Sequence, residues 1–178
     1  METTKWGLDP MHSEIAFKVK HMMIANVTGH FTKFNVDATT EGDDFTKAKI
    51  NFTADVNSID TNNEQRDEHL RTLPDFFDAA KFPQIKFEST SLNKKTAEDY
   101  TLNGNLTIKD VTKPVTLQVN FGGIGKDPYG NTKAGFSIEG KINRKDFGLS
   151  WNAALETGGV LLGEELKIHS EIQLAKQN

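Results

Sequence analysis

Residues 48–56 read AKINFTADV, and this stretch decides the fold. Every second residue from Ala48 to Val56 is apolar, and the residues between them, from Lys49 to Asp55, are polar or charged. Successive side chains of a β-strand point to opposite faces, so this alternation predicts a strand with one face in a core and the other in water. An amphipathic helix would need its apolar residues three or four positions apart.

The same alternation recurs along the chain and predicts about eight strands in all. Phe31 falls out of phase with Phe34 and Val36, which predicts a β-bulge at that point. Strands with one apolar face imply antiparallel pairing, in an up-and-down barrel or a sandwich. The further alternating stretches are 13–21, 28–38, 85–87, 102–108, 115–121, 134–142 and 166–174, with turn-forming residues at 41–44, 109–110 and 127–131.

Two segments depart from this pattern. Residues 61–78 predict a short helical excursion, because Thr61 and Glu64 have the spacing of a capping box and a second turn is expected from Asp75. The other segment, Arg144–Gly163, is long and unusually apolar for a connection between strands. Long irregular connections are often functional.

Composition excludes several classes of protein. The 178 residues carry a formal net charge of -4, with 36% hydrophobic and 26% charged residues, which suits one folded domain spanning 1–178. Basic residues do not cluster, so nucleic-acid binding is not expected. The chain has no cysteine, which excludes disulfides and thiolate metal sites. No run of about 18 apolar residues suggests a transmembrane helix.

The first residues, Met1–Asp9, contain no apolar run of the length that a signal peptide needs. We therefore expect a cytoplasmic protein, or a periplasmic one if a leader has been removed. The cysteine count is silent on this point, because periplasmic proteins also lack cysteine in many cases.

Five separated motifs, taken in order along the chain, resemble the YceI-like family. The resemblance implies an extended eight-stranded antiparallel barrel of lipocalin-like shape. It also implies that a long isoprenoid lipid, such as an isoprenoid quinone or a polyprenyl phosphate, lies inside the barrel. The chain departs from the family pattern at Asp110, where glycine is more common. The motifs are WGLDPMHSEIAFKVKH at 6–21, the set Val27, Thr28, Gly29 and Phe31, RDEHLRTLPDFFDAAKFPQIKFES at 66–89, GNLTIKDVTKPVTL at 104–117 and RKDFGL at 144–149.

Small residues on the inward face suggest a hollow barrel, since eight strands enclose a space that side chains can just fill or that can hold one small ligand. The alternative is that Gly104 and Gly140 let the strands bend and leave no cavity. Both explanations can hold for one residue. The small inward residues are Ala54, Ser89, Gly104, Ala134, Gly140 and Ser170.

Taken with the family resemblance, the inward rows give a predicted ligand-binding set, although aromatic residues at such spacing are also common in a plain core. His21 and Arg144 extend two of the rows to strand ends, where they are expected to meet a polar head group or, alternatively, solvent and acidic partners. The predicted ligand-binding residues are Phe17, Val19, His21, Phe34, Phe52, Phe87, Gly104, Ile108, Phe121, Phe136, Gly140, Arg144, Phe147, Leu149 and Trp151.

No catalytic or metal-binding residues are predicted. Ser13 lies beside His12, but no G-x-S-x-G motif exposes it as a nucleophile, and no H-E-x-x-H motif occurs. We expect His12 and Ser13 to anchor the first strand by hydrogen bonds, and Arg66 and His69 to pin the helix to the barrel.

The predicted function is binding of a long-chain isoprenoid or similar amphiphile, for transport, storage or sensing, without a required cofactor. Two alternatives stay open, namely an enzyme that modifies a lipid in the same cavity and a structural or partner-binding β domain. Apolar loop residues such as Trp151 and Leu155 would suit a homodimer as well as a ligand.

Overall fold

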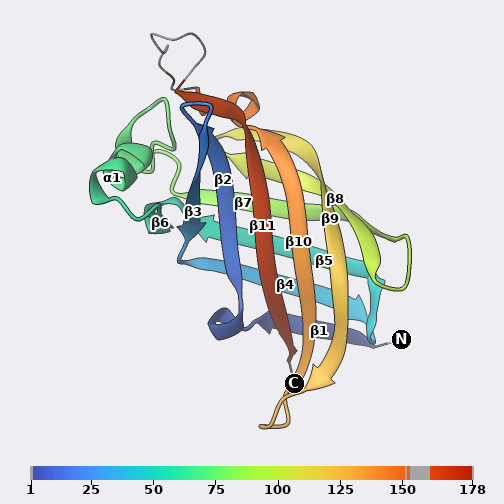
Figure 1. The fold of residues 1–178 in the computed structure, drawn as a ribbon. Helices are drawn as coiled ribbons and strands as arrows, with labels where there is room; N and C mark the ends of the chain where they lie inside the picture. The colour runs from blue at the N-terminus through green and yellow to red at the C-terminus, as the bar shows by residue number, and fades with distance from the viewer. Residues whose placement is uncertain (1, 151, 153–160, 178) are drawn as a thin grey trace.

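The structure is a computed structural model that describes residues 2–150, 152 and 161–177. Nearly all of its regular elements are strands, with one α-helix and three short 3-10 helices among the described residues (Figure 1). In chain order the elements are β1 (Thr3–Leu8), η1 (Pro10–His12), β2 (Glu14–His21), β3 (Ala25–Phe31), β4 (Phe34–Glu41), β5 (Asp44–Asp55), η2 (Val56–Ser58), β6 (Ile59–Asp60), α1 (Glu64–Thr72), β7 (Gln84–Lys94), β8 (Asp99–Ile108), β9 (Val111–Lys126), β10 (Thr132–Asn143), η3 (Arg144–Phe147) and β11 (Leu162–Lys176).

Eight antiparallel strands close into a barrel, as the family resemblance implies. Their order is β1-β4-β5-β7-β8-β9-β10-β11, and pairing of β1 with β11 closes the ring. This last pairing is short and joins Trp6–Leu8 to residues 174–176. Residues 162–171 of β11 pair with β2. β2 in turn pairs with β3, and β3 pairs with β6, so these strands widen the wall at that side.

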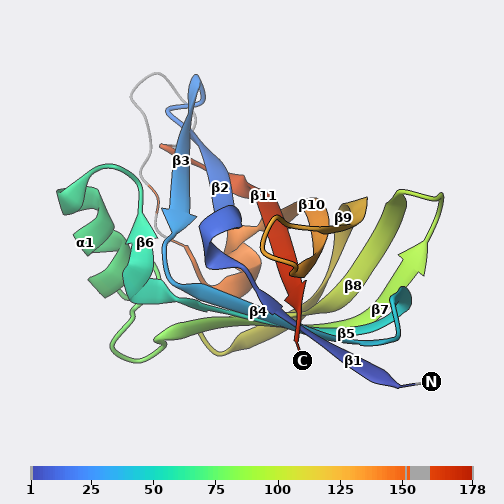
Figure 2. The ribbon, with the colours of Figure 1, turned by 90° about the horizontal axis from the view of Figure 1, so that it is seen from below.

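The barrel has two unlike ends. One end holds α1, the β2–β3 loop, the β8–β9 turn and the start of β11, and we name it the helical end; the other holds both chain termini, and we name it the terminal end (Figures 1 and 2). Lys109 ties the helical end together, because its Nζ donates to Pro74 O at 2.6 Å and to Gly148 O at 3.3 Å.

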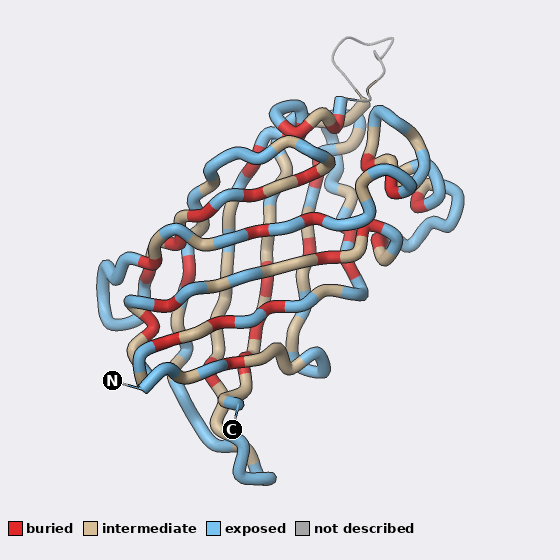
Figure 3. The backbone as a smooth tube through the Cα atoms, turned by 180° about the vertical axis from the view of Figure 1, so that it is seen from behind, coloured by how far each residue is buried: buried red, intermediate tan, exposed pale blue. Residues whose placement is uncertain are grey.

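Burial follows the predicted alternation along the strands (Figure 3). In β8, for example, Leu102, Leu106 and Ile108 are buried, whereas Asn105 between them is exposed. An aromatic cluster fills the inside of the terminal end, with ring centroids 5.0 to 6.0 Å apart. This aromatic plug consists of Trp6, Phe45, Tyr100, Phe121 and Phe136.

Two local predictions were wrong. Phe31 does not form a bulge, because the stretch 28–38 is two strands, and Phe31 is the buried last residue of β3. Helix α1 is capped by Asn63, whose side chain accepts from Arg66 N, and not by a box of Thr61 and Glu64. The predicted second turn is present, since Phe76 N donates to Leu73 O.

Candidate functional site

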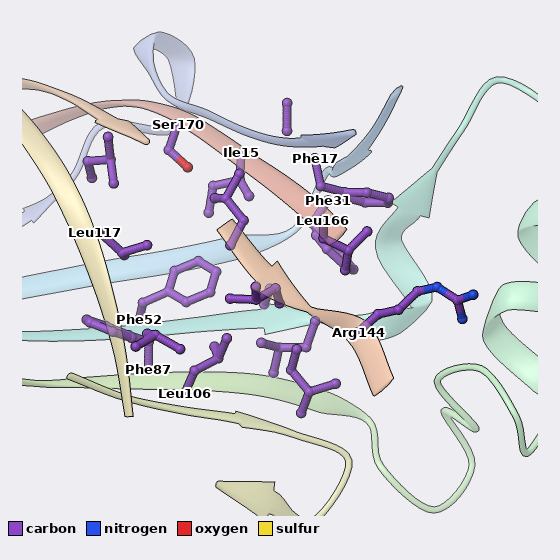
Figure 4. A pocket seen from close by; sticks show the side chains of 18 of the residues that line it. Ile15, Phe17, Phe31, Phe52, Phe87, Leu106, Leu117, Arg144, Leu166 and Ser170 are labelled. Carbon is purple, nitrogen blue, oxygen red and sulfur yellow. The ribbon is translucent and has the colours of Figure 1, made fainter. Parts of the chain in front are cut away.

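The barrel encloses a cavity of about 540 Å³, which lies within the size range of small-molecule sites. We name this cavity the lumen. Its wall comes from the inward rows of the strands and from α1 and the segment after it. Figure 4 shows apolar side chains such as Ile15, Phe52 and Leu166 pointing into the lumen from facing strands.

The middle of the lumen is hollow. Phe17, Phe52, Leu117, Ile138 and Leu166 have the inward parity of core residues, and yet each is only half-buried. A fully packed core buries such side chains completely, because protein interiors are close-packed. Their remaining exposed surface therefore faces the lumen. The lumen ends at the aromatic plug.

The two inward glycines allow close approach between side chain and backbone. A Cβ atom on Gly104 would lie 2.4 Å from Phe87 Cζ, and one on Gly140 would lie 2.2 Å from Leu117 Cδ2. Neither glycine lines the lumen, but Phe87 and Leu117 both do. The glycines thus make room for two large wall residues and do not themselves leave space for a ligand.

Polar side chains gather where the lumen meets the helical end. His21 from β2, Arg144 from η3, and Thr61, Arg66 and His69 from the segment around α1 all line this part. Figure 4 shows the Arg144 side chain directed toward this end, away from the apolar side chains. The lumen therefore has a polar end and a long apolar interior.

Arg144 is buried, with 3% of its surface exposed, and its guanidinium donates to main-chain carbonyls. Nε lies 2.7 Å from Gly163 O, Nη1 2.5 Å from Leu149 O and Nη2 3.4 Å from Leu162 O. Burial lowers the pKa of Arg144 from its ordinary value, and the nearby carboxylate of Glu164 opposes this shift. Arg144 therefore joins the end of β10 to the start of β11.

A second buried polar group holds the start of α1. Asp67 accepts from Thr61 N at 2.9 Å and from Thr61 Oγ1 at 2.5 Å. Arg66 Nε in turn donates to Thr61 Oγ1 at 2.7 Å. This network attaches the helix to the end of β6, which is consistent with the predicted pinning role of Arg66.

Nine of the predicted ligand-binding residues line the lumen, and for all of them binding stays a prediction. Five others lie elsewhere in the structure, and Trp151, like Leu155, lies outside the described residues. Phe121 belongs to the aromatic plug, and Phe34 packs against Phe52 at 6.4 Å between ring centroids. Those in the wall are Phe17, Val19, His21, Phe52, Phe87, Ile108, Phe136, Arg144 and Leu149; those outside it are Phe34, Gly104, Phe121, Gly140 and Phe147.

Other wall residues were not among the predicted ones. Leu117, Ile138 and Ile168 have the right parity, and this signal was present in the sequence. Leu70, Leu73, Phe76 and Phe77, from α1 and the turn after it, have no strand parity. Strand parity could not assign these residues to the wall, and the fold places them there.

The remaining polar candidates have structural partners. Ser13 Oγ accepts from Gln173 N at 2.9 Å, which anchors the start of β2 to β11. His12 Nδ1 lies 2.8 Å from Asp9 Oδ2, and Lys133 Nζ also contacts that oxygen. Within the described part of the chain, no three His, Asp or Glu side chains gather closely enough to hold a metal ion. No described helix is long and apolar enough to cross a membrane.

Comparisons with known proteins agree with this architecture. A UPF0312 protein of Staphylococcus epidermidis is 39% identical over 176 residues, which are 98% of this chain and 99% of that protein. A related UPF0312 protein of Staphylococcus aureus is 37% identical over 173 residues, 97% of this chain and 98% of the relative.

Solved structures show the same barrel. The YCEI protein of Campylobacter jejuni matches with a TM-score of 0.76 and 31% identity, over 89% of this chain and 90% of that one. BcnA of Burkholderia cenocepacia has a TM-score of 0.80 at 23% identity, over 93% and 98%. A polyisoprenoid binding domain from Saccharophagus degradans has a TM-score of 0.71 at 13% identity, over 97% and 98%.

The sequence motifs, the closed eight-stranded barrel and these likenesses agree with one another. The model of the YceI-like domain family matches residues 6–174, which is almost the whole chain. The chain therefore belongs to the YceI-like domain family.

Proposed function

We propose that the protein binds one long-chain amphiphilic lipid of isoprenoid type in the lumen, for transport, storage or sensing. The observation that carries the proposal is the hollow middle of the lumen, where inward apolar side chains such as Phe52 and Leu166 remain half-buried. A flexible apolar chain fills such a space without directional partners, and each buried methylene contributes about 0.8 kcal/mol.

The polar end of the lumen suits the head of the lipid. His21 and His69 offer ring nitrogens there, and histidine can donate to a quinone or phosphate oxygen. The tail would then run from the helical end toward the aromatic plug. The description of the S. degradans domain as polyisoprenoid binding supports an isoprenoid tail.

We propose binding without catalysis and without a required cofactor. The hydrogen bonds of Arg66 go to Thr61, and the guanidinium of Arg144 donates to main-chain carbonyls at the base of β11. These two cations therefore support the fold around the polar end.

Native mass spectrometry of the purified protein, before and after organic extraction, tests the proposal. We expect an added mass of lipid size that extraction removes. Ile168→Trp, which fills the lumen from β11, should carry less lipid, whereas Lys167→Trp on the outer face of the same strand should carry as much as the parent protein. The proposal would be contradicted if the purified protein carried no lipid and also took up no added polyprenol.

A further inference from the structure

The loop between β2 and β3 exposes three consecutive apolar side chains. Met22, Met23 and Ile24 are 44%, 56% and 82% exposed, and we name these residues the apolar tip. They make up three of the six large hydrophobic side chains that are exposed among the described residues. Isolated exposed apolar residues are ordinary, but a contiguous group of them indicates an interaction site.

The backbone of the apolar tip is unfavourable for the residues that occupy it. Ile24 N donates to His21 O at 3.2 Å, which makes Met22 and Met23 the two central residues of a turn. Their φ angles are +53° and +62°, in the left-handed region. Gly and Asn are preferred at such positions, because the Cβ atom of an L-residue crowds the following carbonyl oxygen, glycine has no Cβ, and asparagine can hydrogen-bond locally. The sequence thus keeps methionine at two positions where it helps neither the turn nor the core.

The apolar tip stands beside the polar end of the lumen. His21 and Val27, on the two strands that flank it, both line the lumen. Met22 N donates to Leu161 O at 2.7 Å, and Leu161 is also a wall residue. Figure 1 shows the loop at the helical end of the barrel, beside the start of β11. A surface that met the apolar tip would therefore also meet the place where a lipid enters.

Two lysines of β2 lie on the strand that leads to the apolar tip, although the net charge of the whole chain is -4. The neighbouring start of β11 carries Glu164 and Glu165, and Glu164 Oε1 is paired with Lys145 Nζ at 2.9 Å. Lys18 and Lys20 on β2 are both exposed. Apolar side chains flanked by basic ones are typical of elements that insert into an anionic membrane surface.

We propose that the apolar tip docks the protein on an anionic phospholipid bilayer, with Met22, Met23 and Ile24 inserted among the lipids and the lysines of β2 at the head groups. This orientation places the polar end of the lumen against the membrane. The inference goes beyond the proposed function, because vesicle binding by the apolar tip does not depend on which ligand fills the lumen.

Vesicle flotation tests the docking with phosphatidylcholine vesicles and with vesicles of phosphatidylcholine and phosphatidylglycerol in equal parts. We expect the protein to float with the anionic vesicles and much less with the neutral ones. Met22→Asn with Met23→Gly should lower the partition coefficient by about tenfold or more, because it removes most of the inserted apolar surface. Tyr129→Ser is the matched control, since Tyr129 is 88% exposed and lies in the β9–β10 turn at the terminal end.

The double variant also separates docking from folding. Asn and Gly suit the left-handed backbone of this turn, so the variant should melt no lower than the parent protein while losing vesicle binding. Equal flotation of the variant and the parent protein, or no flotation of either, overturns the proposal. If neither protein floats, and the parent protein is a dimer while the variant is a monomer, the apolar tip is instead a contact between two copies of the chain.

A fluorescent label locates the contact, because the chain has no cysteine of its own. An environment-sensitive dye on Met23→Cys should shift to shorter wavelength when anionic vesicles are added. The same dye on Ala97→Cys, in the exposed β7–β8 turn at the opposite end, should not shift. A shift only at Ala97→Cys would show that the wrong end faces the membrane. The lipid content of the lumen is measured separately by organic extraction. Protein that carries lipid but does not bind vesicles has failed in docking and not in lipid binding.

Discussion

Gly140 packs directly against the side chain of Leu117. A Cβ atom at residue 140 would lie 2.2 Å from Leu117 Cδ2. Gly140 is on β10 and Leu117 on the neighbouring β9. The absence of a side chain on one strand therefore fixes the position of a wall residue on the next.

Gly140→Ala should destabilise the barrel by about 1–3 kcal/mol, the usual cost of overpacking. Leu117→Ala in the same chain should remove most of that cost, because it removes the atom that the new methyl group meets. Chemical denaturation of the two single variants and the double variant measures the coupling. Purely additive effects would show that the cost of the new methyl group does not come from contact with Leu117.

His21 should discriminate between ligands by their heads. His21→Ala should weaken binding of a polyprenol by about 0.5–1.5 kcal/mol, the contribution of one lost neutral hydrogen bond. Binding of the matching hydrocarbon should change little, because its burial in the lumen is unaffected. Titration of both ligands into both proteins checks this, and equal losses for the two ligands would assign His21 to the fold.

Arg144 should act mainly on the fold. Arg144→Met removes donors that now reach the carbonyls of Leu149, Leu162 and Gly163. Loss of hydrogen bonds to a charged group costs about 1.5–3 kcal/mol each, so the variant should melt well below the parent protein. Lys145→Met, next to it and exposed, is the control. A stable Arg144→Met protein that had lost only its preference for polar heads would show that the guanidinium binds the ligand.

Asp9 should contribute to stability at neutral pH and not in acid. The hydrogen bond from Lys133 is the main cause that lowers the pKa of Asp9 below its ordinary value of 3.8, against the opposing effect of burial. A carboxyl whose folded-state pKa is lowered stabilises the fold above its unfolded-state pKa, and this contribution disappears as the pH falls through the lowered value.

Asp9→Asn should therefore be less stable than the parent protein at neutral pH, and the difference should shrink toward zero as the pH falls below 3.8. Urea denaturation over a pH series measures it. Asp110→Asn, at an exposed position in the β8–β9 turn, is the control. If the difference in free energy of unfolding between Asp9→Asn and the parent protein stayed constant over the whole acid range, the charge of Asp9 would not be its cause.

The sequence predicted the barrel wall well, because strand parity is a local property. Phe52 and Leu117 could be assigned to the inner face from their immediate neighbours. Strands β1 and β6 were missed, since β6 has two residues and neither strand shows a long alternation. The position of α1 over the lumen depends on the network around Asp67, which joins residues by tertiary contact.

Depth along the barrel was also beyond the sequence pattern. Parity places Phe121 and Phe136 on the same inner face, but only Phe136 reaches the lumen, while both belong to the aromatic plug. The alternating pattern shows which face of a strand a residue occupies. It does not show how far along the barrel axis that residue lies. The same limit applies to Arg144, which parity took to a strand end without showing the carbonyls that it reaches.

Photocrosslinking with a polyprenol that carries a diazirine near the end of its tail tests the central claim most directly. Peptide mapping by mass spectrometry should place the crosslinks on inward residues between the polar end and the aromatic plug, such as Leu117 on β9 and Ile168 on β11, and excess unlabelled polyprenol should suppress them. Crosslinks confined to outward residues such as Lys167, or crosslinks that unlabelled polyprenol does not suppress, would contradict a lipid held inside the barrel.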